Sequence, residues 1–196
     1  MINYNFYYWG PLLFNTHIKK ENLNKIKKLC KKNIKKSHVE NLAGDIKHEY
    51  TIDKNSLNKI LMPYMETFRH AYKQWYNNTL SEITVSAAWV NYMQPGDYNP
   101  VHIHRNCEFS GVIYIDIPKK LQKEISEYKG TVEGPGTIAF MYGEDAGHCQ
   151  TMKNFVPATG DFYMFPYMLR HSVNPHKSNC ERISIGVNFN IKGEKW

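Results

Sequence analysis

Three histidines have the type and spacing that suit metal chemistry. His102 and His104 are separated by one residue. Alternate residues of a strand point to the same side, so the two imidazoles project together at a spacing suited to one metal ion. The alternative is a pair of partly buried, hydrogen-bonded histidines without a metal. His171 lies on a distant strand candidate, and a jelly roll can bring it beside the pair. Three such ligands leave open positions on the metal for substrate or oxygen.

A second feature follows His171 by eleven residues. Arg182 stands within a strand candidate whose apolar residues continue on alternate positions, and Ser184 shares its strand face. A buried arginine is costly without an anion, and its planar fork suits a carboxylate. The alternative is a surface or interface arginine paired with a protein acid. The combination predicts a pocket for a carboxylate beside the histidines.

The elements that must position these residues change character near Ser81. Before it, the pattern is helical. An amphipathic helix carries Leu23, Ile26, Cys30 and Ile34. A second helix is capped by Asp53 or Asn55, and its apolar stripe is Leu57, Ile60, Leu61, Tyr64, Phe68, Tyr72 and Trp75. Pro63 lies inside this stripe and predicts a kink or a delayed start.

After Ser81 the pattern predicts short strands: Ile83–Tyr92, Asn99–His104, Phe109–Ile117, Gly136–Tyr142, Asp161–Pro166, His171–Val173 and Arg182–Ile191. Such strands are typical of a double-sheet jelly roll. We expect a single domain over residues 1–196, mainly β, with residues 1–80 as a helical support and 81–196 as a jelly-roll core. Gly143–Asn154 is expected to be a polar loop over the mouth of the barrel, and Lys119–Tyr128 a short helix or second lid.

Composition narrows the class of protein. The chain has 196 residues, of which 42% are hydrophobic, and no apolar run is long enough for a membrane span. The four cysteines form no CxxC pair, which favours a reducing cytoplasm. The net charge of +7 is local, because nine lysines against one acid between His17 and Lys36 supply +8. That run contains no arginine and argues against nucleic-acid readout; a solvated face or an acidic partner explains it.

Three segments together resemble the 2-oxoglutarate- and Fe(II)-dependent oxygenases. The segment YMQPGDYNPVHIH, from Tyr92 to His104, is similar to their metal-binding strand entry, and SGVIYI at Ser110–Ile115 to the strand that follows. The segment His171–Asn188 is similar to their distal histidine and the RxS that holds 2-oxoglutarate. The pattern most resembles a prolyl-hydroxylase-like branch with HxH and SGVYY-like residues, found in bacteria and phages, and covers Ala88 to Ile191.

The resemblance implies a role for each matching residue. His102 matches the first metal ligand and His171 the distal one. Arg182 matches the arginine that pairs with the distal carboxylate of 2-oxoglutarate, and Ser184 assists it. Tyr114 matches a tyrosine that hydrogen-bonds the same carboxylate.

Two further tyrosines, Tyr92 and Tyr98, match residues that line the co-substrate pocket. Each of the three tyrosines is equally compatible with ordinary sandwich core.

One position departs from the family pattern. His104 stands where most members have Asp or Glu, and a neutral imidazole leaves the metal more cationic than a carboxylate does. The set also resembles the three-histidine sites of thiol dioxygenases, which use oxygen without 2-oxoglutarate. Glu108 or Asp97 is the alternative third ligand. With His104 at this position, the type of oxidation reaction is less determined by the sequence than the presence of a metal is.

The resemblance implies an enzyme that uses Fe(II), 2-oxoglutarate and O2 to hydroxylate a small-molecule or peptidyl substrate, with release of succinate and CO2. Two other functions remain open: a cupin-like metal dioxygenase without 2-oxoglutarate, and a non-catalytic jelly-roll binding or structural module. We expect a protein of the cytoplasm (the host cytoplasm if a phage encodes it), with no membrane partner. The helices either cover the sheet or form a homodimer contact.

Overall fold

Two antiparallel sheets face each other in the computed structural model, which describes residues 10–30, 37, 43–130, 134–144 and 146–193. The larger sheet has the order β1 (Phe14–His17), β8 (Asp161–Pro166), β5 (Phe109–Asp116), β10 (Arg182–Gly193), β3 (Leu80–Met93) and β2 (Glu49–Thr51). The smaller has the order β4 (Asn99–His102), β9 (Arg170–Val173), β6 (Ile138–Met141) and β7 (Met152–Phe155). This is the predicted jelly-roll arrangement.

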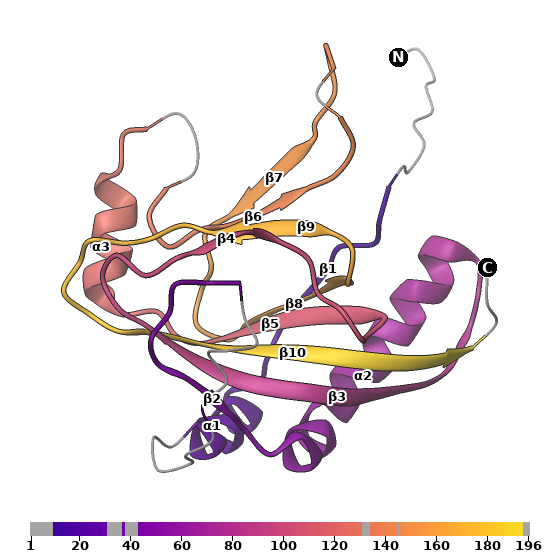
Figure 1. The fold of residues 1–196 in the computed structure, drawn as a ribbon. Helices are drawn as coiled ribbons and strands as arrows, with labels where there is room; N and C mark the ends of the chain where they lie inside the picture. Colours follow the sequence, from indigo (N-terminus) through magenta and orange to yellow (C-terminus); the bar gives the residue numbers. More distant parts are fainter. Residues whose placement is uncertain (1–9, 31–36, 38–42, 131–133, 145, 194–196) are drawn as a thin grey trace, which may run out of the picture.

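Helices cover the outer face of the larger sheet (Figure 1). They are α1 (Lys20–Leu29) and α2 (Lys54–Tyr76), while the short α3 (Lys119–Glu127) lies at one end of the sandwich. No described helix is long and apolar enough to cross a membrane. Ile34, expected on the first helix, falls outside the described residues.

Local signals explain the bounds of α2. The Asp53 carboxylate accepts hydrogen bonds from the backbone N–H groups of Asn55 and Ser56, so Asp53 is the cap. Asn77 ends the helix in the left-handed region, with φ 52°. The helix continues through Pro63, so the predicted delayed start is wrong. Pro63 is exposed, and water can bind the carbonyl that its ring leaves without a donor.

Three strands were not expected. β1 and β2 come from the part of the chain assigned to the helical support, so that part also supplies both edges of the larger sheet. β7 begins at Met152, inside the segment expected to be a loop. All three have three or four residues, too few for alternation to separate them from loop.

Alternation along β10 separates the two layers of the core. Ile183, Ile185 and Val187 pack toward the helices, with the aliphatic and aromatic residues of α1 and α2. Arg182 and Ser184 therefore point to the other face, toward the smaller sheet. The residues predicted to bind a carboxylate thus lie between the two sheets.

Candidate active site

Three imidazoles converge at one end of the space between the sheets. His102 ends β4 and pairs in register with His171 of β9. One ring nitrogen from each of His102, His104 and His171 lies within 4.8 Å of the others. His104 Nε2 is 3.2 Å from His171 Nε2. Two nitrogen ligands of one metal ion, each at ~2.1 Å, lie about 3 Å apart when they subtend a right angle. The spacing therefore suits a shared metal ion.

His104 lies in the loop after β4, so strand alternation does not explain its orientation. β4 ends at His102, two residues before the predicted end of the strand. The backbone N–H of His104 donates to the carbonyl of Tyr167 at 2.9 Å. This bond fixes the loop after β4, so His104 faces His171 although it lies outside the strand.

Backbone carbonyls set the tautomer of two of the rings. His102 Nδ1 lies 2.7 Å from the Pro100 carbonyl oxygen, and His171 Nδ1 lies 2.9 Å from that of Leu169. A carbonyl oxygen only accepts, so each Nδ1 carries the hydrogen. Each Nε2 therefore presents its lone pair to the common centre, as a metal ligand requires.

Burial keeps all three histidines neutral. Desolvation lowers the pKa of His102, and it lowers the pKa of His104 to about 3, with the neighbouring His102 adding to the shift. The pKa of the buried His171 is also well below its ordinary value, through desolvation first and the other two histidines second. Neutral imidazoles bind metal without first losing a proton.

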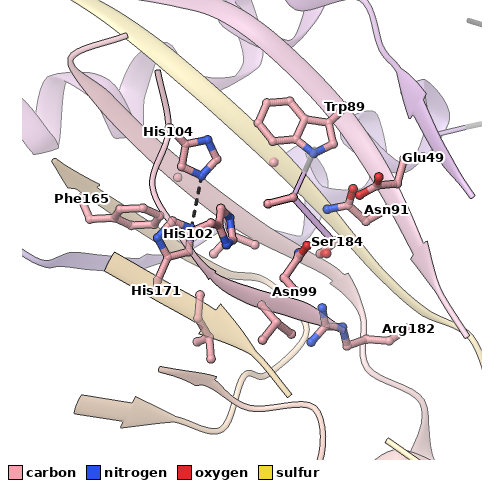
Figure 2. A pocket seen from close by; sticks show the side chains of 16 residues that line it. Glu49, Trp89, Asn91, Asn99, His102, His104, Phe165, His171, Arg182 and Ser184 are labelled. Atoms are coloured by element: carbon pink, nitrogen blue, oxygen red, sulfur yellow. Dashed lines mark hydrogen bonds between the residues drawn. The ribbon is translucent and has the colours of Figure 1, made fainter. Parts of the chain in front are cut away.

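The histidines share one pocket with polar residues of the larger sheet (Figure 2). Trp89 and Asn91 of β3, Arg182 and Ser184 of β10 and Glu49 of β2 line it. Because these residues come from adjacent strands of one sheet face, their relative positions are fixed by backbone pairing.

Arg182 is a buried cation that forms no ion pair with an acid in the described part of the chain. Its side chain is 2% exposed, and its Nη1 donates to the Gly136 carbonyl at 3.0 Å. Nε has no hydrogen-bond partner, and the ion pairs found among the described residues do not include Arg182. Such burial is costly unless an anion completes it. Arg182 is therefore not a surface arginine, and no acid of the described residues pairs with it.

Tyr114 adds a second unsatisfied group at the same place. The Arg182 guanidinium lies 5.4 Å from the centre of the Tyr114 ring. The Tyr114 hydroxyl is buried and has no hydrogen-bond partner, and burial raises its pKa, so it remains a neutral donor. Ser184 is the register partner of Tyr114 and brings its own hydroxyl to the same face.

Iron and 2-oxoglutarate both fit these residues. Three neutral imidazoles are suitable ligands for a divalent transition metal. Arg182 Nε and the Tyr114 hydroxyl are buried donors without an acceptor. A carboxylate has two oxygen atoms that can accept these hydrogen bonds. The donor set and the orphaned polar atoms thus match one metal ion and one anionic co-substrate.

Two of the predicted pocket tyrosines lie elsewhere. Tyr92 faces the helices and donates its hydroxyl to the carbonyl of Cys30. It neighbours Asn91 on β3, and adjacent strand residues point to opposite faces, so its assignment to the pocket is wrong. Tyr98 is 42% exposed and is not among the residues that line the pocket.

The two carboxylates considered as third ligand have other partners. Glu108 accepts a hydrogen bond from the backbone N–H of Ile191 at 3.2 Å and lines a different cavity. Asp97 accepts from the Gln94 N–H at 2.8 Å and closes the turn after β3. Within the described part of the chain, neither joins the histidine group, and His104 is the third candidate ligand.

Sequence reasoning missed Trp89, Asn91 and Glu49. Trp89 and Asn91 alternate on β3 with Val90, which faces the helices, so strand periodicity contained the signal for both. Glu49 lies on the three-residue β2, where no periodicity is measurable. Only the pairing of β2 with β3 reveals it.

Comparisons with solved structures identify the architecture. A prolyl-4-hydroxylase of Pseudomonas putida matches with a TM-score of 0.58 at 16% identity, over 91% of each chain. A prolyl hydroxylase of Trichoplax adhaerens matches with 0.59 at 13% identity, over 92% of this chain and 83% of that one. The viral collagen prolyl hydroxylase of Paramecium bursaria Chlorella virus-1 matches with 0.56 at 12% identity, over 90% and 94%. These likenesses confirm the double-stranded β-helix.

The comparison with family models carries the assignment further. No curated protein matches the chain in sequence. Residues 87–188, just over half of the chain, match the family described as "Putative 2OG-Fe(II) oxygenase". That span contains all three histidines, Arg182 and Ser184. The cofactors of this class are Fe(II), 2-oxoglutarate and O2. The chain belongs to this family of 2-oxoglutarate- and Fe(II)-dependent oxygenases.

Proposed function

We propose that this oxygenase is a hydroxylase that converts 2-oxoglutarate and O2 into succinate and CO2 while it inserts one oxygen atom into a C–H bond of its substrate. The observation that carries the proposal is the buried Arg182. Among the described residues it has no carboxylate partner, and it lies beside the unpaired hydroxyl of Tyr114.

His102, His104 and His171 would hold the Fe(II). When bound, the ion supplies the redox chemistry that couples decarboxylation of the co-substrate to hydroxylation. The protein keeps the three imidazoles neutral and oriented through burial and the carbonyls of Pro100 and Leu169. Three neutral ligands leave the full charge of the ion in place, and this favours an anionic co-substrate.

Arg182, Ser184 and Tyr114 would bind the distal carboxylate of 2-oxoglutarate. Their donors satisfy carboxylate oxygens that lose water on entering the pocket, and the anion neutralises the buried guanidinium. The substrate is a small molecule or a peptidyl side chain. Solved relatives named as prolyl hydroxylases support the peptidyl alternative.

The test is anaerobic addition of Fe(II) and 2-oxoglutarate to metal-free protein. We expect a visible metal-to-ligand charge-transfer band. His171→Ala should abolish it, and Arg182→Lys should raise the 2-oxoglutarate concentration needed for half-saturation by roughly tenfold or more, because an ammonium cannot reproduce the two-pronged contact.

Matched variants separate these effects from general damage. His70, an exposed histidine of α2, and Arg69, whose Nη1 pairs with Glu66 on the same helix, are the controls. His70→Ala and Arg69→Lys should leave the band unchanged. Metal binding without a band would favour a three-histidine dioxygenase that does not use 2-oxoglutarate. Failure to bind metal would refute the proposal altogether.

A further inference from the structure

A cross-strand row of polar residues lies on the inner face of the larger sheet, and Ser184, Asn91 and Glu49 of this row line the pocket. Backbone register pairs Tyr114 of β5 with Ser184 of β10, Ser184 with Asn91 of β3, and Asn91 with Glu49 of β2. Directly paired residues share a sheet face. The row therefore joins the donors around Arg182 to a carboxyl group two strands beyond Ser184, roughly 10 Å away at ~4.8 Å per strand.

Glu49, at its end of this row, has no partner among the residues that the structure describes. It is 1% exposed, and neither carboxylate oxygen accepts a hydrogen bond from them. Asn91 is 7% exposed, and its Oδ1 is also without a partner. Both side chains line the pocket that contains the histidines, and Figure 2 shows them next to each other. Buried acceptors without donors are rare in folded proteins and require a reason.

The co-substrate does not supply the missing donor. 2-Oxoglutarate carries two carboxylates, and the donors that suit them lie around Arg182. The donors around Arg182 therefore account for the co-substrate, and the end of the pocket at Glu49 is left for another molecule.

We propose that Glu49 and the Asn91 Oδ1 atom bind a cationic N–H group, an ammonium or a guanidinium, of the substrate to be hydroxylated. Such a group donates several hydrogen bonds and neutralises a buried carboxylate. The proposal rests on the oxygenase function above and names the substrate class: small molecules or peptide side chains that carry an amino or guanidino group.

Electrostatics agree with a site built for a cation. Burial, with a smaller contribution from the nearby Asp97 carboxylate, raises the pKa of Glu49 to about 8. The free protein therefore keeps this carboxyl largely protonated at neutral pH, and a cation would favour its ionised form. The other titratable groups of the pocket are the three histidines, neutral through burial, and Arg182, which remains charged.

The test measures binding of side-chain analogues by calorimetry. The cationic probes are n-butylammonium and n-propylguanidinium, and the neutral probes are n-butanol and n-butyramide. Each is titrated into metal-free protein and into protein loaded with Mn(II) and 2-oxoglutarate. We expect wild-type protein at pH 8.5 to prefer a cationic probe over both neutral ones. Glu49→Gln should weaken cation binding roughly tenfold or more.

Glu82→Gln is the matched control, because Glu82 is an exposed residue near the start of β3 and forms an ion pair with Lys192. It should bind the cations as wild type does. A second measurement uses the wild-type protein alone. Its affinity for the cations should rise as the pH increases toward 8.5, while its affinity for n-butyramide should not. Equal binding of cationic and neutral probes, unchanged binding in Glu49→Gln, or no cation binding would overturn the proposal.

The metal-free arm separates this inference from the oxygenase function. If the cations bind through Glu49 but the charge-transfer band never forms, the oxygenase proposal fails while the cation site stands. If the band forms and no cation binds, the oxygenase proposal stands and Glu49 has no role in substrate recognition.

Discussion

The Nε2 atoms of His104 and His171 face each other at 3.2 Å although their residues come from different segments, 67 positions apart. In metal-free protein one of the two nitrogens donates to the other. With a metal, both lone pairs point to it instead. Protons and a metal ion therefore compete for the same ring nitrogens. The effect of protons can be measured separately in metal-free protein.

We expect metal-free protein to lose stability as pH falls below about 6.5. The unfolded histidines take up protons near that pH, while burial keeps the pKa values of the folded ones lower, so protonation favours unfolding. Urea denaturation at a series of pH values measures the free energy of unfolding. His104→Ala should reduce the slope below pH 6.5, and an unchanged slope would contradict the assignment of neutral, buried imidazoles.

Glu49 predicts the opposite dependence at higher pH. Its pKa is about 8 in the folded protein against an ordinary value of 4.5, so the folded state holds the proton more tightly. Its contribution to stability is present below pH 4.5 and is lost as pH rises toward 8. Glu49→Gln should remove this decline, so that the variant exceeds wild type in unfolding free energy at pH 8.5. Glu82→Gln should keep the wild-type profile.

Tyr114→Phe should separate function from stability. The Tyr114 hydroxyl is buried without a partner, and removing an unsatisfied group costs the fold little or stabilises it. The same change deletes a donor to the co-substrate. We expect an unfolding free energy equal to or above that of wild type, together with a weaker affinity for 2-oxoglutarate, by about 1 kcal/mol. A denaturant series and an anaerobic titration measure the two quantities.

Tyr92→Phe should behave in the reverse way. Its hydroxyl bonds to the Cys30 carbonyl on the helical face of the sheet. Loss of that bond should lower the unfolding free energy by about 1 kcal/mol, with 2-oxoglutarate affinity unchanged. A weakened affinity in this variant, with its fold intact, would restore Tyr92 to the co-substrate pocket.

Gly186→Ala tests the floor of the pocket. A Cβ at this position would lie 2.3 Å from ring atoms of Trp89, whose indole lies 5.9 Å from the His104 ring between centroids. Trp89 must move, so we expect a loss of about 1–3 kcal/mol in unfolding free energy and a disturbed charge-transfer band. Gly147→Ala, where nothing lies within 4 Å of the added Cβ, should change neither.

The sequence predicts the parts of this site that local patterns encode. Residue type and periodicity are enough to recognise the spacing of His102 and His104 and the eleven-residue separation of His171 and Arg182 along the chain. They also predict the strands on or near which these residues lie. Asp53 is recognisable as a helix cap for the same reason. Assigning Tyr92 fails because similarity to a motif does not state which face of β3 a residue occupies, whereas alternation against Val90 and Asn91 does.

Other parts depend on pairing between distant segments. Glu49 reaches the pocket because three residues of β2 pair with β3, some forty positions away. His104 is fixed by a bond to the Tyr167 carbonyl rather than by a strand. Neither contact leaves a local pattern, so only the folded chain reveals the unsatisfied carboxyl and the convergence of the third imidazole.

Because β2 is short and lies at the edge of the sheet, the two ends of the pocket differ in the free energy needed to open them locally. Arg182 and Ser184 lie on β10, which is paired with β3 along its length and with β5 from Ile183 to Phe189. Glu49 lies on an edge strand of three residues, whose other side has an isolated bridge from Ser37 to Tyr50. Edge backbone opens at a lower free energy than central strands. Amide hydrogen exchange should therefore be fast at Glu49 and slow at Ser184. The end of the pocket proposed to bind the substrate is therefore expected to open more readily than the end that would hold 2-oxoglutarate.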